Sequence, residues 1–171
     1  MNAGRAMFVR GSAARSPALL VVCLLAWGSV ALALFLQHGL GMQPCAWCTL
    51  QRLVYIVLGA VALLGWGWSG RTAVRRVAGL VAAITGVAGI AAALYQQFVA
   101  SKTSSCVFTL ADKIIGAVEL DGLMPWMFKA RAACDEANVD LLGFPFAWWS
   151  ALLFLVLTVL SLAVLFAPSE R

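Results

Sequence analysis

The sequence predicts an all-α membrane protein: a bundle of four transmembrane helices with a short amphipathic surface helix in the second outward loop. The chain of 171 residues is 63% hydrophobic and 11% charged, which does not suit a soluble globular domain. The apolar residues gather in four long stretches, each able to cross a hydrocarbon core of about 30 Å at about 1.5 Å per residue. We therefore expect residues 1–171 to form a single membrane domain.

The four predicted spans cover residues 17–37, 49–68, 77–98 and 144–166. Three of them carry no charged residue, and the second carries only Arg52. The third span repeats small residues at spacings of three and four, a pattern that lets membrane helices pack closely: Gly79, Ala82, Ala83, Gly86, Gly89 and Ala93. An alternative is that the first stretch is a cleaved signal peptide, since Ala31-Leu32-Ala33 resembles a cleavage site. The stretch is longer than the usual apolar region of such a peptide, which favours a span.

The arginines predict which loops face the cytoplasm, because short loops rich in Lys and Arg stay on that side. The N-terminal tail and the link between the second and third spans are basic and contain no acidic residue: Arg5, Arg10, Arg15, Arg71, Arg75 and Arg76. We expect both termini in the cytoplasm and the loops at residues 38–48 and 99–143 on the opposite side. The basic residues are spread over both sides of the membrane, so the net charge of +5 does not indicate nucleic-acid binding.

The second outward loop is predicted to be partly ordered. Its apolar residues recur at helical spacing: Val107, Leu110, Ala111, Ile114, Ile115 and Val118. This pattern predicts a short amphipathic helix on the membrane surface. A proline-broken apolar patch around Trp126 follows it.

The segment Pro44-Cys45-Ala46-Trp47-Cys48 predicts redox chemistry at the start of the second span. Two thiols separated by two residues can close a small disulfide ring. The helix N-terminus and Arg52, one turn later, both favour the thiolate of Cys48. A stabilised thiolate is also a better leaving group in disulfide exchange. The alternatives are a static disulfide and half of a four-cysteine zinc site.

Cys106 and Cys134 form a second candidate pair in the second outward loop, where an oxidising compartment lets disulfides persist. A disulfide between them would close a loop of roughly 30 residues and contribute about 3 to 4 kcal/mol in the chain-entropy model. The pair could equally exchange with the Cys45–Cys48 pair, and the spacing does not separate a structural from a catalytic role. Cys23, inside the first span, is expected to be a packing residue.

Arg52 is an ionisable residue in an apolar span, which marks either a site or a side chain snorkelling to the headgroups. Its guanidinium could donate hydrogen bonds to a carbonyl of a lipid-soluble acceptor such as a quinone. Three further polar residues stand at the outward ends of spans, His38 after the first and Gln96 and Gln97 at the end of the third. Each is a candidate for the acceptor pocket or a plain helix-end residue.

Together these motifs resemble the DsbB family of bacterial inner-membrane disulfide bond formation proteins. The resemblance rests on the four spans, Gln37-His38 ahead of Pro44-Cys45-Ala46-Trp47-Cys48, Arg52 four residues on, and the later pair of Cys106 and Cys134. This order also separates the chain from proteins similar to vitamin K epoxide reductase, in which the loop pair precedes the CxxC.

The resemblance implies a thiol:quinone oxidoreductase that reoxidises a DsbA-like periplasmic thioredoxin-fold oxidant and passes two electrons to the membrane quinone pool, either ubiquinone or menaquinone. It implies that the reduced partner attacks Cys106, that Cys134 helps to resolve the mixed disulfide, and that Cys45 exchanges with Cys134. Cys48 would then face the quinone beside Arg52.

The same resemblance places the cysteine loops in the periplasm and implies no metal. Some family members carry a histidine near the outer end of the third span, where this chain has Gln96-Gln97. His38 and Gln97 are therefore the further candidates for quinone contact. The alternative functions are a non-catalytic membrane scaffold with two structural disulfides and an oxidoreductase similar to vitamin K epoxide reductase.

Overall fold

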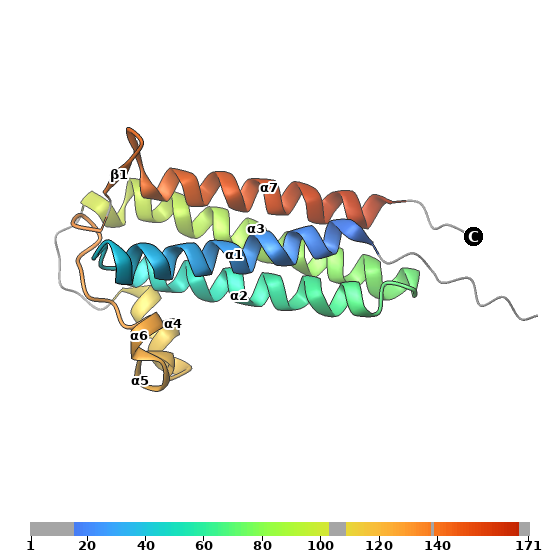
Figure 1. Cartoon of the computed structure of the whole chain (residues 1–171), viewed down its shortest axis with the longest axis horizontal. Coiled ribbons are helices and arrows are strands. Elements are labelled where there is room, and N and C mark those ends of the chain that lie inside the picture. The colour runs from blue at the N-terminus through green and yellow to red at the C-terminus, as the bar shows by residue number, and fades with distance from the viewer. Residues whose placement is uncertain (1–15, 103–108, 138, 168–171) are drawn as a thin grey trace, which may run out of the picture.

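The computed structural model describes residues 16–102, 109–137 and 139–167. Four helices in it are long and apolar enough to cross a membrane: α1 (Pro17–Gly39), α2 (Ala46–Gly67), α3 (Thr72–Phe98) and α7 (Phe146–Phe166). They run side by side along one axis, alternating in direction (Figure 1). The predicted bundle of four transmembrane helices is confirmed.

The four helices pack in a ring, with α1 against α2, α2 against α3, α3 against α7 and α7 back against α1. Fully buried apolar side chains fill the centre, among them Leu19, Leu58 and Phe154. Large apolar side chains such as Leu24 and Ile84 also cover the outside of the bundle. An apolar exterior is what helices surrounded by lipid require.

Helices α3 and α7 approach each other closely. A Cβ atom added at Gly86 would meet the side chain of Thr158, and one added at Gly89 would meet the ring of Phe154. Without a side chain at these positions the two backbones come close together, as the stripe of small residues predicts.

Three helix starts differ from the predicted spans. Helix α3 begins at Thr72, five residues before the predicted start at residue 77, and the starts of α2 and α7 differ for local reasons. Helix α2 begins at Ala46, three residues before the predicted span, because Cys45 caps it and accepts a hydrogen bond from the backbone N–H of Cys48 at 3.3 Å. Helix α7 begins two residues late, because Phe144 and Pro145 form a strand instead.

In the described residues of the second outward loop there are three short helices, where one was predicted. They are α4 (Leu110–Ala117), α5 (Leu120–Leu123) and α6 (Pro125–Phe128), preceded by the 3-10 turn η1 (Ala100–Lys102). Helix α4 corresponds to the predicted amphipathic helix and starts with a capping box formed by Thr109 and Asp112. Its break comes after Gly116, where Glu119 adopts the left-handed conformation at φ 53°, and Pro125 starts α6 afresh.

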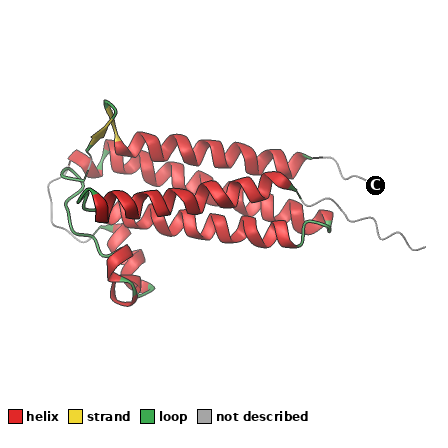
Figure 2. Ribbon diagram, in the orientation of Figure 1, coloured by secondary structure: helices red, strands yellow, loops and turns green. Residues whose placement is uncertain are grey.

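These short helices lie beside the end of the bundle where α2 begins (Figure 1). Ala111 and Ile115 of α4 are buried at the contact with α2, whereas Leu110 and Val118 are exposed. At the same end, strands β1 (Asp140–Leu141) and β2 (Phe144–Pro145) form a hairpin (Figure 2). Its turn residues Leu142 and Gly143 have φ values of 55° and 83°, as a two-residue hairpin turn requires.

The opposite end of the bundle holds the link between α2 and α3, the start of α1 and the end of α7 (Figure 1). Arg75 in this region donates from Nη2 to the backbone carbonyl of Ala167 at 3.0 Å. The arginine-rich link and the CxxC segment therefore lie at opposite ends of the molecule, separated by the length of the spans.

Candidate redox site

Three cysteine sulfurs meet at the N-terminus of α2. The Sγ atoms of Cys45 and Cys48 are 2.7 Å apart, and Cys45 is also in side-chain hydrogen-bond contact with Cys134. All three are free thiols in this structure, and Cys45 is fully buried between the other two. Cys45 therefore has two alternative partners within reach, one from its own helix and one from the second outward loop. Cys106 lies outside the described residues.

Backbone hydrogen bonds hold the segment that carries Cys134 against the start of α2. The N–H groups of Arg131 and Ala132 both donate to the carbonyl of Pro44, at 2.9 and 3.3 Å. The backbone N–H of Trp47 donates to the Cys134 sulfur. Residues from two distant parts of the sequence are thus joined directly beside the thiols.

The two thiols outside the span have opposite electrostatic settings. The hydrogen bond from Cys45 lowers the pKa of Cys134, the N–H of Trp47 acts in the same direction, and partial burial opposes them. The contacts with Cys134 and Cys48, together with burial, raise the pKa of Cys45 well above its usual value. Of these two sulfurs, Cys134 is therefore the one suited to carry negative charge, beside a protonated Cys45.

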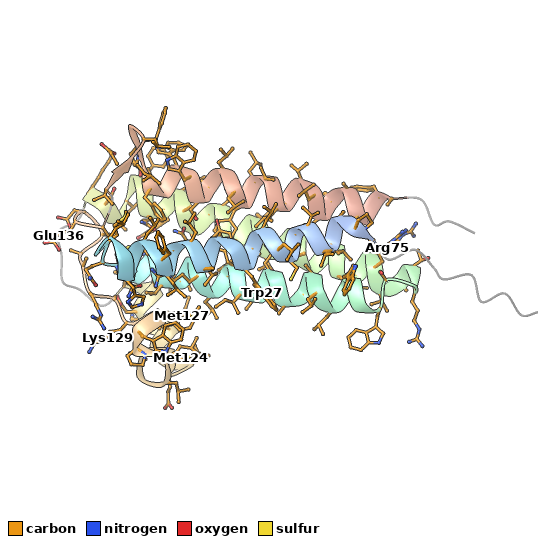
Figure 3. The ribbon with its side chains drawn as sticks, in the orientation of Figure 1. Trp27, Arg75, Met124, Met127, Lys129 and Glu136 are labelled. Carbon is orange, nitrogen blue, oxygen red and sulfur yellow. The ribbon has the colours of Figure 1, made fainter. Side chains whose placement is uncertain are left out.

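Arg52 is buried one turn below Cys48 and is held by two acceptors. Its Nη1 donates to Gln37 Oε1 at 2.6 Å and to the carbonyl of Met127 at 2.8 Å. Gln37 in turn donates from Nε2 to the carbonyl of Trp126 at 3.2 Å. The guanidinium therefore points into the protein and ties α1 and α2 to α6, instead of snorkelling away. Figure 3 shows Met124, Met127 and Lys129 gathered at this end of the molecule, with Arg75 at the other.

A cavity of about 430 Å³ opens beside Cys48 and Arg52. Apolar side chains of α1 and α7 form most of its wall, including Val30, Leu36, Leu153 and Val156. Its polar lining includes Cys48, Gln51, Arg52, Tyr55, Gln96 and Ser150. A mostly apolar cavity with a few polar groups suits a flat, apolar ligand that carries oxygen atoms.

Only some of the residues that the sequence predicts for the site line this cavity. Cys48 and Arg52 line it, whereas His38 is exposed at the end of α1, and neither His38 nor Gln97 is among the lining residues. Gln96, next to Gln97, is 1% exposed and donates from Nε2 to the Cys48 sulfur at 3.3 Å. Cys23 is buried in α1 among core residues, away from the other thiols.

Sequence reasoning gave no role to four polar residues around the site: Gln37, Gln51, Tyr55 and Ser150. Each is buried within a membrane-spanning helix, at 4%, 5%, 5% and 8% exposure. Polar side chains in apolar spans are costly and mark functional or packing sites. The presence of these four residues in the predicted spans was therefore a signal in the sequence that could have identified them. Which of them face one another depends on how the helices pack.

Comparisons with known proteins agree with this arrangement. The family model of disulfide bond formation protein DsbB matches residues 15–164. A disulfide bond formation protein B of Dechloromonas aromatica is 37% identical over 131 residues, covering 74% of this chain and 78% of that protein.

Two further proteins of that name align over more of the chain. The one from Azoarcus sp. is 30% identical over 160 residues, which is 92% of this chain and 96% of the relative. The one from Ralstonia nicotianae is 29% identical over 153 residues, covering 89% and 94%. The match extends from the first span to the last and includes the thiol segment, and the chain therefore belongs to the DsbB family of thiol:quinone oxidoreductases, which form disulfide bonds.

Proposed function

We propose that this chain reoxidises a DsbA-like periplasmic partner through two exchanging cysteine pairs, Cys106–Cys134 and Cys45–Cys48. The observation that carries the proposal is the position of Cys45, whose sulfur contacts both Cys48 and Cys134. A sulfur with two alternative partners in reach is what exchange between two disulfides requires. The lowered pKa of Cys134 supports its role as the attacking thiolate.

The oxidised protein holds both pairs as disulfides. A thiolate of the reduced partner attacks Cys106, which breaks the Cys106–Cys134 bond and frees Cys134 as a thiolate. Cys134 then attacks Cys45, which forms the Cys45–Cys134 bond, breaks Cys45–Cys48 and frees Cys48 as a thiolate. The second partner thiolate attacks the partner's sulfur bound to Cys106, so the partner leaves as a disulfide and Cys106 is reduced.

The pairs then return to their first state. Cys106 attacks Cys134, which restores the Cys106–Cys134 disulfide and leaves Cys45 and Cys48 as a dithiol. The chemistry that a bound quinone supplies is acceptance of the two electrons and two protons of this dithiol as the Cys45–Cys48 disulfide re-forms. One partner molecule is thereby oxidised for each quinone reduced.

The cavity beside Cys48 is the proposed quinone site. Its apolar wall fits a quinone ring and the start of an isoprenoid tail, of either ubiquinone or menaquinone. Both hydrogen bonds of the Arg52 guanidinium to described residues leave from Nη1. We assign its remaining N–H groups to a quinone carbonyl oxygen. Of the two glutamines that the sequence suggested for this pocket, Gln96 lines the cavity and is the one we assign to it.

The proposed location is the bacterial inner membrane, with both termini in the cytoplasm and the cysteine loops in the periplasm. The support is the separation of the arginine-rich link from the thiols by the full length of the spans (Figure 1). The positive-inside rule places that link in the cytoplasm. The thiols then meet a periplasmic partner.

The test uses the purified full-length protein with a reduced DsbA-like partner and a soluble quinone analogue. Because Cys134→Ser leaves no disulfide at Cys106 for the reduced partner to attack, we expect it to stop partner turnover while it keeps the Cys45–Cys48 pair. The same variant should still reduce quinone with dithiothreitol as donor. Cys45→Ser should abolish both activities, because it breaks the pair next to the acceptor.

The matched control is Cys23→Ala, which removes a buried thiol from α1 and should leave both activities intact. A non-catalytic scaffold with structural disulfides predicts a different result. In that case Cys134→Ser and Cys45→Ser would lower stability while partner oxidation continued at the wild-type rate, and the proposal would be wrong.

A further inference from the structure

Five side chains from three helices form a continuous hydrogen-bond chain along one side of the cavity. The Tyr55 hydroxyl lies 3.1 Å from Ser150 Oγ, and Ser150 Oγ donates to Gln51 Oε1 at 2.5 Å. Gln51 Nε2 donates to Gln96 Oε1 at 2.7 Å, and Gln96 Nε2 donates to Cys48 Sγ at 3.3 Å. The chain thus connects α7 and α3 to the first turn of α2 and ends on a reactive sulfur.

The direction of this chain follows from its far end. The Tyr55 hydroxyl donates to the backbone carbonyl of Ser150 at 3.1 Å, and a carbonyl can only accept. The single Tyr55 proton is shared between the backbone carbonyl and Oγ of Ser150, at 3.1 Å each, because the Ser150 proton is donated to the Gln51 carbonyl oxygen. That bond turns the amide N–H group of Gln51 toward Gln96, and the next bond turns the amide N–H group of Gln96 toward Cys48. Every donor points the same way, and each bond polarises the next.

Burial makes this arrangement costly unless each group is paired. Gln51, Gln96, Ser150 and Tyr55 are all less than 10% exposed and lie within membrane-spanning helices. An unpaired amide or hydroxyl in hydrocarbon costs on the order of several kcal/mol, because its hydrogen bonds to water are lost and not replaced. The network is therefore held in one arrangement, and the Gln96 amide has a fixed orientation.

The last acceptor distinguishes this chain from a purely structural link between helices. A thiol carries its own proton and is a weak acceptor, whereas a thiolate accepts hydrogen bonds strongly. A donor aimed at Cys48 therefore favours its charged form. Among the described residues, the other titratable or charged groups near Cys48 are Cys45, Cys134 and Arg52, and Arg52 is already engaged with Gln37 and Met127.

We propose that Gln96 is a positioning residue for Cys48. Its amide N–H group stabilises negative charge on the Cys48 sulfur, and Gln51, Ser150 and Tyr55 fix the orientation of that amide through uncharged hydrogen bonds. The proposal rests on the function proposed above, in which Cys48 is the thiolate released next to the acceptor. Because none of the four donors is charged, the chain stabilises the thiolate without placing a fixed charge against an apolar quinone ring.

The test measures Cys48 itself in the reduced, quinone-free full-length protein. Iodoacetamide is added over a range of pH, and mass spectrometry with site localisation counts alkylation of Cys48 and, as an internal reference, of Cys45. The variants are Gln96→Met, Gln51→Met and Ser150→Ala, of which the first two keep the length of the side chain and lose its donor. The matched control is Ser161→Ala, the same change on the same helix at a hydroxyl that donates to the carbonyl of Leu157.

We expect the half-maximal pH of Cys48 alkylation to rise by about one unit in Gln96→Met, which is about tenfold less alkylation at a fixed lower pH. The rise should be smaller in Gln51→Met and smallest in Ser150→Ala, in the order of the chain. Ser161→Ala should leave the profile unchanged. A wild-type profile in Gln96→Met, or an equal shift in Ser161→Ala, would overturn the proposal.

Thermal unfolding of the same variants separates positioning from packing. A structural role predicts that the alkylation profile follows lost stability, so that Ser161→Ala shifts it as much as Ser150→Ala. The alkylation assay needs neither partner nor quinone. A wild-type alkylation profile in Gln96→Met would leave the proposed two-pair exchange intact, and a failure of the exchange test would leave the effect of Gln96 on Cys48 measurable.

Discussion

At the scale of single residues, Arg52 has two tasks that its position in the sequence does not separate. Its charge lies beside Cys48 in the cavity lining, and its Nη1 holds the carbonyl of Met127 at the base of the loop that carries Cys134. Gln37 shares the second task, because it accepts from Arg52 and donates to the backbone carbonyl of Trp126. The acceptor side and the partner side of the site are thus linked through one guanidinium.

We expect Arg52→Met to slow quinone reduction by about 10- to 100-fold, since hydrogen bonds to a charged group contribute about 1.5 to 3 kcal/mol. Exchange with the partner should fall less, because Arg131 and Ala132 still hold the loop on the carbonyl of Pro44. The two half-reactions are measured separately, with dithiothreitol and with reduced partner as electron donors. Arg71→Met, an exposed arginine at the opposite end, is the control. Equal losses in both half-reactions would contradict a specific role toward the acceptor.

At the scale of elements, the contact between α3 and α7 positions the polar chain. Phe154 of α7 packs against Gly89 on one side, and its ring stacks on that of Tyr55 with centroids 3.9 Å apart and planes 6° from parallel. Tyr55 begins the hydrogen-bond chain that ends at Cys48. The small residues of α3 therefore help to fix the geometry of the site as well as the spacing of the helices.

Gly89→Ala is predicted to destabilise the bundle by about 1 to 3 kcal/mol, the usual cost of overpacking a close contact. The added Cβ would meet the ring of Phe154, which cannot move without disturbing Tyr55. Thermal unfolding in detergent measures the change. Gly28→Ala on α1 is the matched control, because nothing lies within 4 Å of its added Cβ. Equal stability of the two variants would show that the α3–α7 contact tolerates expansion.

The second outward loop shows the limit of reading elements from periodicity. The spacing that begins at Val107 predicts the helix observed from Leu110, and the Thr109–Asp112 capping box explains its start. It does not predict α5 or α6, since each is only four residues long and depends on the turn at Glu119 and on Pro125. Helices this short form only with tertiary support.

At the scale of the whole molecule, charge and chemistry are divided between the two ends of the bundle. Arg71 and Arg76 are exposed in the link between α2 and α3, and Lys129 and Arg131 are exposed in the thiol-bearing loop. These two segments lie at opposite ends of the bundle (Figure 1), as the labelled Arg75 and Lys129 show (Figure 3). Of these two segments, only the link that holds Arg71 and Arg76 has basic residues and no acidic ones. By the positive-inside rule, this asymmetry supports the proposed orientation of the chain in the membrane.

Trypsin should therefore cut the protein at different places from the two sides of the membrane. In right-side-out vesicles we expect cleavage near Lys129 and Arg131, and in inside-out vesicles near Arg71 and Arg76. Mass spectrometry of the fragments identifies the sites, and detergent-solubilised protein, cut at both, serves as the control. Cleavage near Arg71 from the periplasmic side would reverse the proposed orientation.

The sequence by itself determined the features that depend on local order along the chain. Hydropathy is a property of consecutive residues, so the four spans follow from it, and Pro44 with the CxxC marks the start of α2 because capping is local. The family resemblance implied that Cys45 exchanges with Cys134, but the contact between their thiols needed the tertiary structure, since the docking of the loop on Pro44 brings the two together.

The same holds for the choice of Gln96 over Gln97 and for the burial of Gln37 beside an exposed His38. One residue along a helix is a turn of about 100°, so neighbours in sequence face different surroundings. Composition shows that polar residues stand in apolar spans, and the rotation of each packed helix decides which of them reach the sulfur of Cys48.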